Sequence, residues 1–352
     1  MIQTPLIIPT PQTFRINGKT YVDTGKKFPS SSFGDIYLVH EKDDETQQYI
    51  LKSAKKFPTK EDTDKNFEML EEEYDLLFAV DQCPHIIKVN GFLRDEGYAI
   101  MLSQYAKGGE LLDYINSPKY ITFETFCNLF RQLIIAVRCI HSLGIYNRDI
   151  KPENIVFLDR EQTQLAIIDF GMAVKPAKDD CYENVGTNDY KAVEVVDNYK
   201  RPFKCSKADI FALGKTLRYL FMLVRTANPG YIKMKTLIMK MLQKEPEERI
   251  SLDDAIEEYN QFSDKKIEAV NIKDEDEDED FILVFKAKKS LRKIKSKQIK
   301  RKSKSKQIKS KSLQKSKQIK RKSKSLQKSK QIKRKSLQKS KQIKRKSLQK
   351  SK

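Results

Sequence analysis

The sequence predicts an α+β fold, in which a small strand-rich N-terminal region surrounds one long helix and a larger helical region follows. Three observations predict this order. Strand-like runs fill residues 15 to about 110, helical spacing dominates residues 111 to about 262, and a lysine-rich repeat ends the chain. A chain of 352 residues can form one large domain or two small ones.

The N-terminal region is expected to hold short strands around a single amphipathic helix. The strand-like runs, with turn residues between them, are RINGKTYVDTGKKF, GDIYLVH and QQYILKSAKKF. The segment DKNFEMLEEEYDLLFAV then has helical spacing, with Phe67, Leu70, Leu77 and Val80 on one side and acidic residues elsewhere. In the helical region the longest element is FETFCNLFRQLIIAVRCIHSLG, which we expect to end at Gly144.

The C-terminal tail is a repeat that we expect to be disordered. The unit RKSLQKSKQIK begins at Arg334 and again, truncated, at Arg345. Its large apolar residues are spaced five or six positions apart, so neither a helix nor a strand gathers them on one face, and the like charges repel. With the preceding acidic run DEDEDED and the pentad FILVF, we expect a linker over 263–285 and the disordered tail over 286–352.

The net charge of +21 conceals two parts of opposite sign. Residues 281–352 hold 32 Lys and Arg and no acidic residue, so residues 1–280 hold the remaining 37 of the 69 basic residues against 48 acidic ones, a net charge of −11. Such a tail is expected to bind nucleic acid or an anionic membrane surface, with an affinity that falls as salt rises. Base stacking is not expected, because the repeats lack aromatic residues. The KRKS clusters also resemble nuclear import signals, and a solvated spacer is the alternative.

Cysteine usage and hydropathy predict the compartment. The five cysteines are odd in number and scattered without CxxC pairs, which argues against a disulfide framework and a zinc site and suits a reducing compartment. We expect core or surface thiols, with Cys181 as the one candidate for an exposed, reactive thiol. The N-terminus has no charged start before a long apolar core, and no run of 18 apolar residues occurs, so neither a signal peptide nor a transmembrane helix is expected. We expect an intracellular monomer of the cytoplasm or nucleus.

The stretch IYNRDIKPENIVF carries the strongest chemical signal. Within seven residues it places an arginine, Asp149, Lys151 and Asn154, each costly to bury without a function. Phosphoryl transfer requires an oriented nucleophile, held phosphates and metal ions that offset charge. Asp149 can accept a hydrogen bond from a substrate hydroxyl, Lys151 can steady the phosphoryl group, and Asn154 can hold a metal ion. Fifteen residues after Asn154, LAIIDFGMA places Asp169 where a second metal ligand belongs.

RDIKPEN followed at this distance by DFG resembles the eukaryotic protein kinase domain of the serine/threonine type, nearest to the calcium/calmodulin-dependent group. The resemblance covers residues 15–262. It implies a bilobal protein kinase fold, with a small β-rich N-lobe that carries one key helix and a larger helical C-lobe. It also implies ATP and Mg²⁺ as cofactors, and transfer of the γ-phosphate to serine or threonine of protein substrates.

Positions that match the family's motifs take over its catalytic roles. Lys52 in YILK lies where the family's strand lysine holds the α- and β-phosphates, and Glu73 resembles its ion-pair partner, with Glu68, Glu71 and Glu72 as alternatives. The resemblance makes Asp149, Lys151, Lys52 and Glu73 the catalytic residues and Asn154 and Asp169 the magnesium ligands. The residues expected around ATP are Phe33, Gly34, Ile36, Ile50, Lys52, Ser103, Gln104, Tyr105, Ala106, Glu110 and Val156.

The segment GTNDYKAVE (186–194) resembles the one that closes the family's activation loop. Thr187, together with the lysine after the catalytic aspartate, matches the serine/threonine branch. Glu194 is then expected to pair with Arg249, and Asp209 to brace the backbone of the catalytic loop.

In the family, the arginine at Arg148 usually binds a phosphate on the activation loop. Glu183 lies where that phosphorylated residue is often found, and Asp179 and Asp180 precede it. A carboxylate offers the arginine a charge-assisted contact with less charge than phosphate. One expectation is therefore partial activity without loop phosphorylation. The equally weighted alternative is that these acids form a solvated loop face.

The phosphate-covering loop departs from the family's glycine-rich pattern. It reads PSSSFGDI over 29–36, with Pro29 and Ser31 in place of two glycines and only Gly34 retained. Glycine lets the backbone approach phosphate closely, so weaker ATP binding or slower turnover is expected.

Other departures lie in the nucleotide pocket, the catalytic loop and the C-lobe. Ile50 replaces the usual alanine that packs on adenine and Ser103 occupies the gatekeeper position, two changes that we expect to compensate in part. Asn147 replaces a histidine that packs under the Phe of DFG, which predicts a softer site but not a dead one. Only 34 residues separate Gly214 from Arg249, so a substrate-docking helix is expected to be shortened.

The sequence therefore predicts a serine/threonine protein kinase, with an ATP-binding pseudokinase or scaffold as the alternative. Glu110 and Glu153 match positions that receive arginines in basophilic kinases, so substrates with basic residues near the target serine are expected. The same R-K-S pattern occurs in the tethered tail, which predicts autophosphorylation there or competition by the tail. The tail serines concerned are Ser303, Ser323, Ser336 and Ser347. His85 and His141 are expected to be packing or helix-end residues without an acid–base partner.

Overall fold

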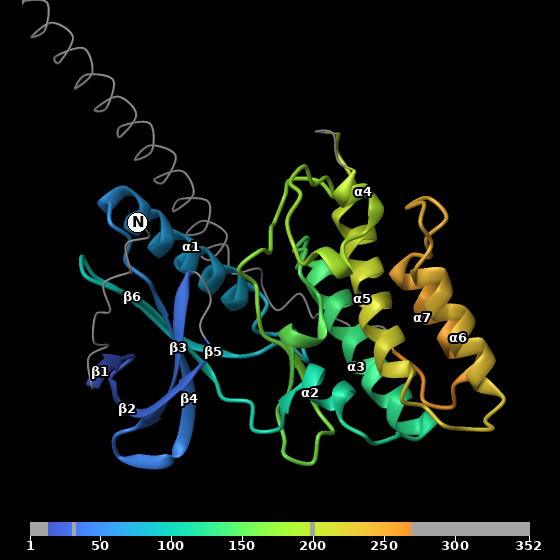
Figure 1. Ribbon diagram of the computed structural model, residues 1–352, viewed down its shortest axis with the longest axis horizontal. Coiled ribbons are helices and arrows are strands. Elements are labelled where there is room, and N and C mark those ends of the chain that lie inside the picture. Colours follow the sequence, from blue (N-terminus) through green and yellow to red (C-terminus); the bar gives the residue numbers. More distant parts are fainter. Residues whose placement is uncertain (1–12, 30–32, 198–200, 269–352) are drawn as a thin grey trace, which may run out of the picture. The chain divides into compact units, whose positions relative to one another are not determined.

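The computed structural model describes residues 13–29, 33–197 and 201–268, in which a strand-rich part is followed by a helical part (Figure 1). The acidic run, the pentad FILVF, the basic repeats and Ser31 lie outside the described residues. The predictions made for them, disorder of the tail included, stay predictions.

A six-stranded antiparallel sheet forms the N-terminal part. Its strands are β1 (Thr13–Ile16), β2 (Lys19–Phe28), β3 (Gly34–Glu41), β4 (Asp44–Ala54), β5 (Val89–Arg94) and β6 (Ala99–Gln104), in the spatial order β1-β2-β3-β4-β6-β5. Asn17 and Gly18 turn the chain between β1 and β2 with φ of 49° and 81°, the left-handed backbone that two-residue hairpins favour. The predicted runs at GDIYLVH and QQYILKSAKKF are confirmed as β3 and β4, whereas RINGKTYVDTGKKF, predicted as a single run, is divided by the turn at Asn17–Gly18 into β1 and β2.

Helix α1 (Lys60–Ala79) is the one long helix predicted for this part. Thr59 caps its first turn, and its apolar face packs against β5 and β6. Phe67 and Leu77 on that face are each 1% exposed, so the predicted apolar face is confirmed. Because this face is fixed against the sheet, the direction of the buried Glu73 on the same helix is fixed as well.

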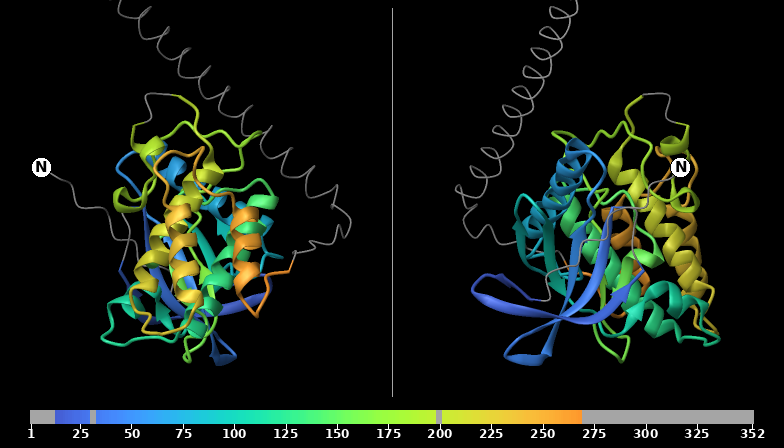
Figure 2. Two further views of the ribbon diagram at one scale, coloured as in Figure 1. Left: turned by 90° about the vertical axis from the view of Figure 1, so that its right-hand side faces the viewer. Right: turned by 60° about the vertical axis from the view of Figure 1, so that its left-hand side comes forward.

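The helical part follows β6. Its helices are α2 (Leu111–Asn116), α3 (Phe123–Ser142), α4 (Val193–Val196), α5 (Cys205–Phe221), α6 (Gly230–Met241) and α7 (Leu252–Phe262). Helix α3 packs against α5 and α7, and Figure 2 shows this part from two further sides. The predicted end of α3 is confirmed, because Gly144 follows the helix with a φ of 68°, where glycine is favoured.

A small sheet of three strands supports the catalytic sequence. Its strands β7 (Gly109–Glu110), β8 (Ile155–Phe157) and β9 (Leu165–Ile167) lie in the order β7-β8-β9. Every residue of β8 and β9 is buried, and the two strands pair antiparallel. The RDIKPEN sequence enters β8 and DFG follows β9, so two paired, buried strands hold both motifs close to one another.

The C-terminal end of the helical part is compact. Residues 222–229 alone connect α5 to α6, and the structure describes no further helix between them. The shortening of a substrate-docking helix, expected from the short interval after Gly214, stays a prediction.

The cysteine prediction is wrong. Disulfides join Cys83 to Cys139 and Cys181 to Cys205, and Cys127 is the free cysteine. The bonded residues are 56 and 24 positions apart, so the fold and not the local spacing brings them together. The expectation of an exposed thiol at Cys181 is also wrong, because this residue is 3% exposed. Among the described residues, no helix has the length and apolar character needed to cross a membrane.

Candidate active site

The carboxylate of Asp149 lies in a hydrogen-bond cluster built from two segments. Its Oδ2 accepts from Lys151 Nζ at 2.8 Å and from Asn154 Nδ2 at 2.9 Å. Its Oδ1 accepts from the backbone N and the hydroxyl of Thr187, each at 2.8 Å. Lys151 Nζ also donates to Thr187 Oγ1 at 2.7 Å, which closes the cluster. Four donors thus fix the orientation of a carboxylate whose side chain is 11% exposed.

The chain comes very close to itself beside this cluster. Gly186, immediately before Thr187, has a φ of 98°, a left-handed conformation that L side chains rarely adopt. A Cβ there would lie 2.5 Å from the carbonyl O of Arg148. Glycine is therefore required for Thr187 to reach Asp149.

Lys52 on β4 and Glu73 on α1 form an ion pair between the sheet and the helix. Lys52 Nζ lies 2.7 Å from both carboxylate oxygens of Glu73 and 3.9 Å from Asp169 Oδ1. Of the alternative partners, Glu71 contacts Arg94 instead. Burial lowers the pKa of Lys52, but the charges of Glu73 and Asp169 outweigh it and raise the pKa, so the lysine remains a cation.

Asn147 is fully buried and joins the two aspartates of the site. Its Nδ2 donates to the carbonyl O of Asp169 at 2.7 Å, and its Oδ1 accepts from the backbone N of Asp149 at 3.1 Å. Both polar atoms of the amide therefore have a partner, as a buried polar side chain requires. The predicted softening is not accompanied by an unsatisfied group at this position.

Asp209 on α5 holds the backbone of the catalytic loop. Its Oδ2 accepts from Asn147 N at 2.9 Å and its Oδ1 from Arg148 N at 2.8 Å. Arg148 has a φ of 66°, an uncommon backbone conformation for a non-glycine residue, and these bonds stabilise it. His141 Nε2 also contacts Asp209 Oδ2, at 2.9 Å. The expectation that His141 has no acid–base partner is wrong, because the fold brings in a carboxylate 68 residues away.

The residues expected around a nucleotide lie on facing strands. Ile50 is directly opposite Ser103 in the β4–β6 pair, so these two departures from the family's pattern are neighbours on one face. Alternation along β4 puts Lys52 on the same face as Ile50, and Ile36 is opposite Lys52 in the β3–β4 pair. The other residues expected around the nucleotide lie on or next to these strands and those of the small sheet. Phe33 and Gly34 lie at the start of β3. Gln104 ends β6 and is followed by Tyr105 and Ala106, Glu110 ends β7, and Val156 lies on β8.

Asn66 holds the start of β3, a role that no motif indicated. Its Nδ2 donates to the carbonyl O of Phe33 and to that of Lys55, each at 2.8 Å, and the residue is 4% exposed. The sequence signal for this role was the position of Asn66, four residues before Leu70 and therefore on the apolar side of α1. A polar residue on that side requires a partner, but the sequence does not show which one.

Three acids of the activation segment, residues 169–194, contact other residues: Glu183, Asp179 and Asp180. Arg148 Nη1 lies 2.6 Å from Glu183 Oε2, and Arg148 Nε donates to the carbonyl O of Met172 at 2.6 Å. Asp179 and Asp180 contact the start of α5. Because the Glu183 side chain is still 67% exposed, partial activity without loop phosphorylation and a solvated loop face both stay predictions.

Glu194 and Arg249 form a second, buried ion pair. The guanidinium lies 2.6 Å and 3.1 Å from the two carboxylate oxygens, and Arg249 is 1% exposed. Nη1, Nη2 and Nε also donate to backbone carbonyls, so the buried charge is fully hydrogen-bonded. This pair fixes the end of the activation segment against the helical part.

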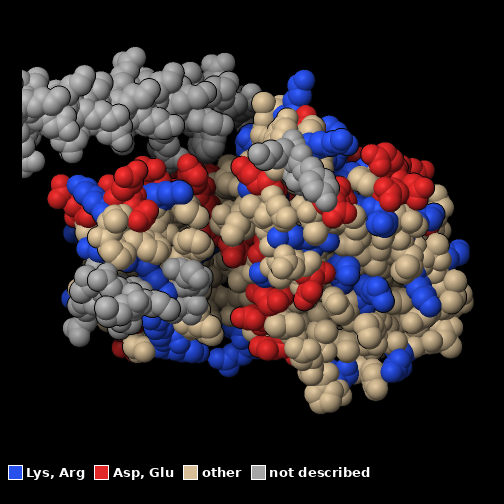
Figure 3. All heavy atoms as spheres, turned by 45° about the horizontal axis from the view of Figure 1, so that its top comes forward, with Lys and Arg blue, Asp and Glu red and all other residues tan. Residues whose placement is uncertain are grey.

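Three carboxylates gather at the end of β7. Burial raises the pKa of Glu110, and the charges of Asp113 and Glu153 raise it further. Glu153 Oε2 is buried and has no hydrogen-bond partner among the described residues. In Figure 3, acidic side chains line the hollow between the strand-rich and helical parts. Such a cluster is suited to binding a cationic side chain.

Comparison with known proteins identifies the family. The protein kinase domain model matches residues 23–229. The chain is similar to calcium-dependent protein kinase 11 of Arabidopsis thaliana, with 28% identity over 261 residues, 66% of this chain and 51% of the relative. It is similar to serine/threonine-protein kinase ppk34 of Schizosaccharomyces pombe, with 30% identity over 221 residues, 53% of this chain and 59% of the relative. The chain spans about half the length of the curated relatives it matches.

These findings agree with the motifs and with the geometry. The family match covers more than half of the chain, and the relatives are serine/threonine and calcium-dependent kinases. The resemblance drawn from RDIKPEN and DFG is confirmed. The chain belongs to the protein kinase family.

Proposed function

We propose that this chain is an active serine/threonine protein kinase that transfers the γ-phosphate of ATP to hydroxyl groups of protein substrates. The observation that carries the proposal is the convergence of five polar side chains from distant parts of the sequence. These are Lys52, Glu73, Asp149, Asn154 and Asp169. A protein that only binds partners has no need to hold all five together.

Each residue near Asp149 has a distinct task in the proposed reaction. Asp149 accepts the hydrogen bond of the substrate hydroxyl and directs its oxygen at the γ-phosphorus. Lys151, bonded to Asp149, steadies the transferring phosphoryl group. Thr187 connects the substrate-side segment to the same carboxylate, which supports serine or threonine as acceptor. Lys52, kept cationic by Glu73, binds the α- and β-phosphates.

Asn154 and Asp169 are the residues that would hold Mg²⁺. Within the described ranges, no three His, Cys, Asp or Glu side chains cluster as a metal site made of protein alone. A carboxylate and an amide fit magnesium, which keeps several waters and binds through one or two side chains plus substrate phosphates. The Asp169 side chain is 41% exposed and so accessible to such a complex. Bound magnesium would offset the phosphate charge during transfer.

We propose that substrates carry basic residues near the target hydroxyl. Glu110, Asp113 and Glu153 support this preference, because burial and then the charges of Asp113 and Glu153 raise the pKa of Glu110, and a bound cation would stabilise its carboxylate. The R-K-S sequences of the tail have the same chemistry, so tail serines are proposed substrates in cis. Binding of the tail to nucleic acid or an anionic membrane, and residence in the cytoplasm or nucleus, stay proposals from the sequence.

Glu183 is proposed to replace loop phosphorylation. The contact of 2.6 Å with Arg148 supports it, although the Glu183 side chain is 67% exposed and the pair is partly screened. We expect Glu183→Ala to lower kcat/KM for a peptide by about tenfold, with exposed Glu161→Ala as the control. Unchanged activity in Glu183→Ala would remove the idea.

The alternative is a pseudokinase that binds ATP without transferring phosphate. Pro29 in the phosphate-covering loop and Ile50 in the nucleotide pocket motivate it. The satisfied amide of Asn147 weighs against it, since the replacement in the catalytic loop leaves no broken contact.

A transfer assay separates the two. Labelled ATP, Mg²⁺ and a basic serine peptide are incubated with wild type or Asp169→Ala, and nucleotide binding is measured in parallel. The kinase proposal expects label on the peptide with wild type, with loss in Asp169→Ala and on chelation of Mg²⁺. Nucleotide binding without any transfer by the wild type would establish the pseudokinase instead.

A further inference from the structure

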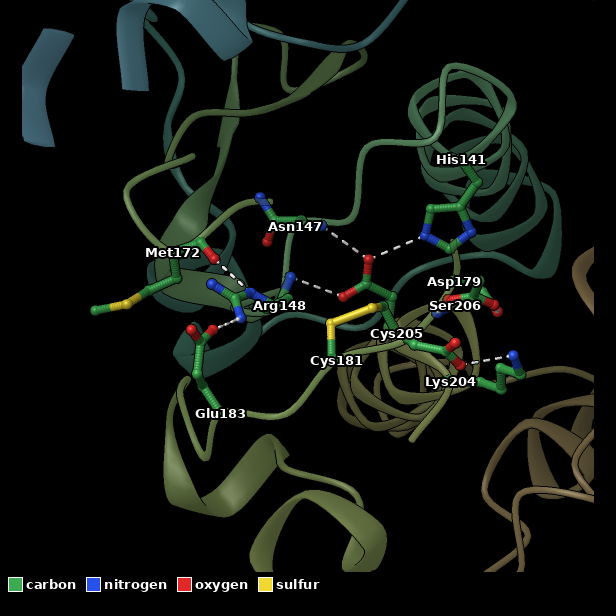
Figure 4. The surroundings of a disulfide bond; sticks show 12 residues. His141, Asn147, Arg148, Met172, Asp179, Cys181, Glu183, Lys204, Cys205 and Ser206 are labelled. Atoms are coloured by element: carbon green, nitrogen blue, oxygen red, sulfur yellow. Dashed lines mark hydrogen bonds and ion pairs between the residues drawn. A yellow bond between two sulfur atoms is a disulfide. The ribbon is translucent and has the colours of Figure 1, made fainter. Parts of the chain in front are cut away.

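The activation segment is attached to the start of helix α5 at one covalent point. The disulfide between Cys181 and Cys205 joins the middle of the segment to the first residue of α5 (Figure 4). Beside it, Cys181 N donates to Phe203 O at 2.8 Å and Phe203 N to Cys181 O at 3.0 Å. The disulfide and these two backbone hydrogen bonds hold the segment around Cys181 against the residues at the start of α5.

Two acids immediately before Cys181 contact the same helix end. Asp179 Oδ1 accepts from Ser206 N at 2.9 Å, and its other oxygen accepts from the Ser206 hydroxyl. This bond satisfies a backbone N–H in the first turn of α5, where a carboxylate is also favoured by the helix dipole. Lys204 Nζ lies 2.8 Å from Asp180 Oδ1. These contacts are partly or fully exposed to solvent, whereas the two sulfurs lie within a buried apolar cluster.

The disulfide is connected to the catalytic loop through both of its halves. Two residues after Cys181, Glu183 contacts Arg148. One helical turn after Cys205, Asp209 accepts hydrogen bonds from the backbone of Asn147 and of Arg148. Helix α5 therefore positions the catalytic loop by hydrogen bonds and the activation segment by a covalent bond.

We propose that the Cys181–Cys205 disulfide is a redox-controlled modification site that sets the activity of the kinase, an inference that rests on the proposed function. With the bond formed, the activation segment is fixed on α5 and the enzyme is in its more active state. A vicinal dithiol reductant breaks the S–S bond: two electrons and two protons convert the cysteines to thiols, and the dithiol becomes a disulfide. Hydrogen peroxide reverses the step, as two thiols and one peroxide give the disulfide and two waters.

Reduction leaves the non-covalent contacts of this region: those of Asp179, Asp180 and Cys181 near the start of α5, the ring contact of Tyr190 with Tyr219, and the apolar packing of Ala192 and Val195. Surface ion pairs and single hydrogen bonds contribute little individually, so the segment separates from α5 more often. Thr187 is then hydrogen-bonded to Asp149 for a smaller fraction of the time, so the site for the protein substrate is less often assembled. The nucleotide side, with Lys52 and Glu73, is not attached through this bond. Reduction should therefore lower kcat/KM for a peptide and leave nucleotide affinity unchanged.

The second disulfide provides a matched control. Cys83 and Cys139 join the chain just after α1 to helix α3, and both lie outside the activation segment in the sequence. Both sulfurs are buried, as those of Cys181 and Cys205 are. If the reductant acted on the fold in general, loss of either disulfide should lower activity. The proposed effect should depend on the Cys181–Cys205 disulfide alone.

The experiment uses the full chain, oxidised with peroxide or reduced with dithiothreitol. Differential alkylation with mass spectrometry reports which cysteines are bonded, and peptide kinetics and nucleotide binding follow on the same samples. We expect kcat/KM of the wild type to fall about tenfold on reduction and to return on reoxidation. Cys181→Ala/Cys205→Ala should match the reduced wild type and not respond to dithiothreitol. Cys83→Ala/Cys139→Ala should keep the wild-type response.

Two results would overturn the proposal. One is alkylation of Cys181 and Cys205 in the peroxide-treated protein without prior reduction, which means that the bond does not form. The other is an equal kcat/KM in both states. If no state of the protein transfers phosphate, the proposed function fails. Amide hydrogen exchange of residues 182–186 then tests whether the disulfide holds the activation segment on α5. Faster exchange after reduction supports this role, and unchanged exchange refutes it.

Discussion

The catalytic loop and the nucleotide-facing strands both depart from the family's pattern, but in different physical ways. In the loop, Asn147 replaces a histidine, and its amide has a partner for both polar atoms. On the strands, Ile50 and Ser103 change the volume and shape of an apolar surface and lie opposite each other. A polar replacement is tolerated when its hydrogen bonds are satisfied, whereas a change of volume is tolerated when a neighbour changes in the opposite direction.

Of the two regions compared, the catalytic loop should give the larger effect when the hydrogen bonds made by Asn147 are removed. Asn147→Ala leaves the carbonyl of Asp169 and the backbone N of Asp149 without their partner, so both aspartates lose a fixed position. We expect kcat to fall about 10- to 100-fold, with a smaller change in nucleotide affinity. Steady-state kinetics and nucleotide titration measure the two quantities, and the exposed Asn90→Ala is the control. A kcat equal to that of wild type would show that the bridge is dispensable.

A smaller effect should show whether the volumes of Ile50 and Ser103 compensate for each other on the facing strands. Ser103→Met adds bulk opposite Ile50 and should raise KM for ATP several-fold, by about 1 kcal/mol of binding. In an Ile50→Ala background the same substitution should have little effect, because the space is now open. KM for ATP in the four proteins of this double-mutant cycle measures the coupling. Additive effects would mean that the two positions act independently.

The smallest effect concerns the acidic cluster at the edge of the catalytic loop. The pKa of Glu110 is raised above 4.5 by burial and by Asp113 and Glu153, so its charge is lost at a higher pH than that of an ordinary glutamate. The preference for an arginine-containing peptide over its alanine counterpart should therefore weaken as the pH falls toward that pKa. The ratio of kcat/KM for the two peptides, followed from about pH 8 down to about pH 5, measures it. Glu110→Gln should flatten the profile, and an equally steep profile in this variant would assign the effect to another group.

Much of the fold was predictable because its signals are local. The Asn-Gly turn, the apolar spacing of α1 and the glycine after α3 each depend on residues within a few positions. The catalytic motifs were predictable for the same reason, since RDIKPEN and DFG are short and each follows or precedes a buried strand.

Contacts between distant residues were not predictable in the same way. Cys83, just after α1, and Cys139 on α3 are brought together by the fold, and no spacing rule relates positions 56 apart. The partner of His141 comes from α5, and the partners of Asn66 lie at the start of β3 and the end of β4. In each case the sequence showed a group that needs a partner but did not show the partner.

The most direct test of the central claim compares wild type with Asp149→Asn. The substitution keeps the size of the side chain and removes the charge that would orient the substrate hydroxyl. We expect nucleotide affinity to stay within about twofold and phosphate transfer to a basic serine peptide to fall about 10³-fold. Transfer by Asp149→Asn at the wild-type rate would contradict the account, because the reaction would then not depend on the carboxylate around which the site is built.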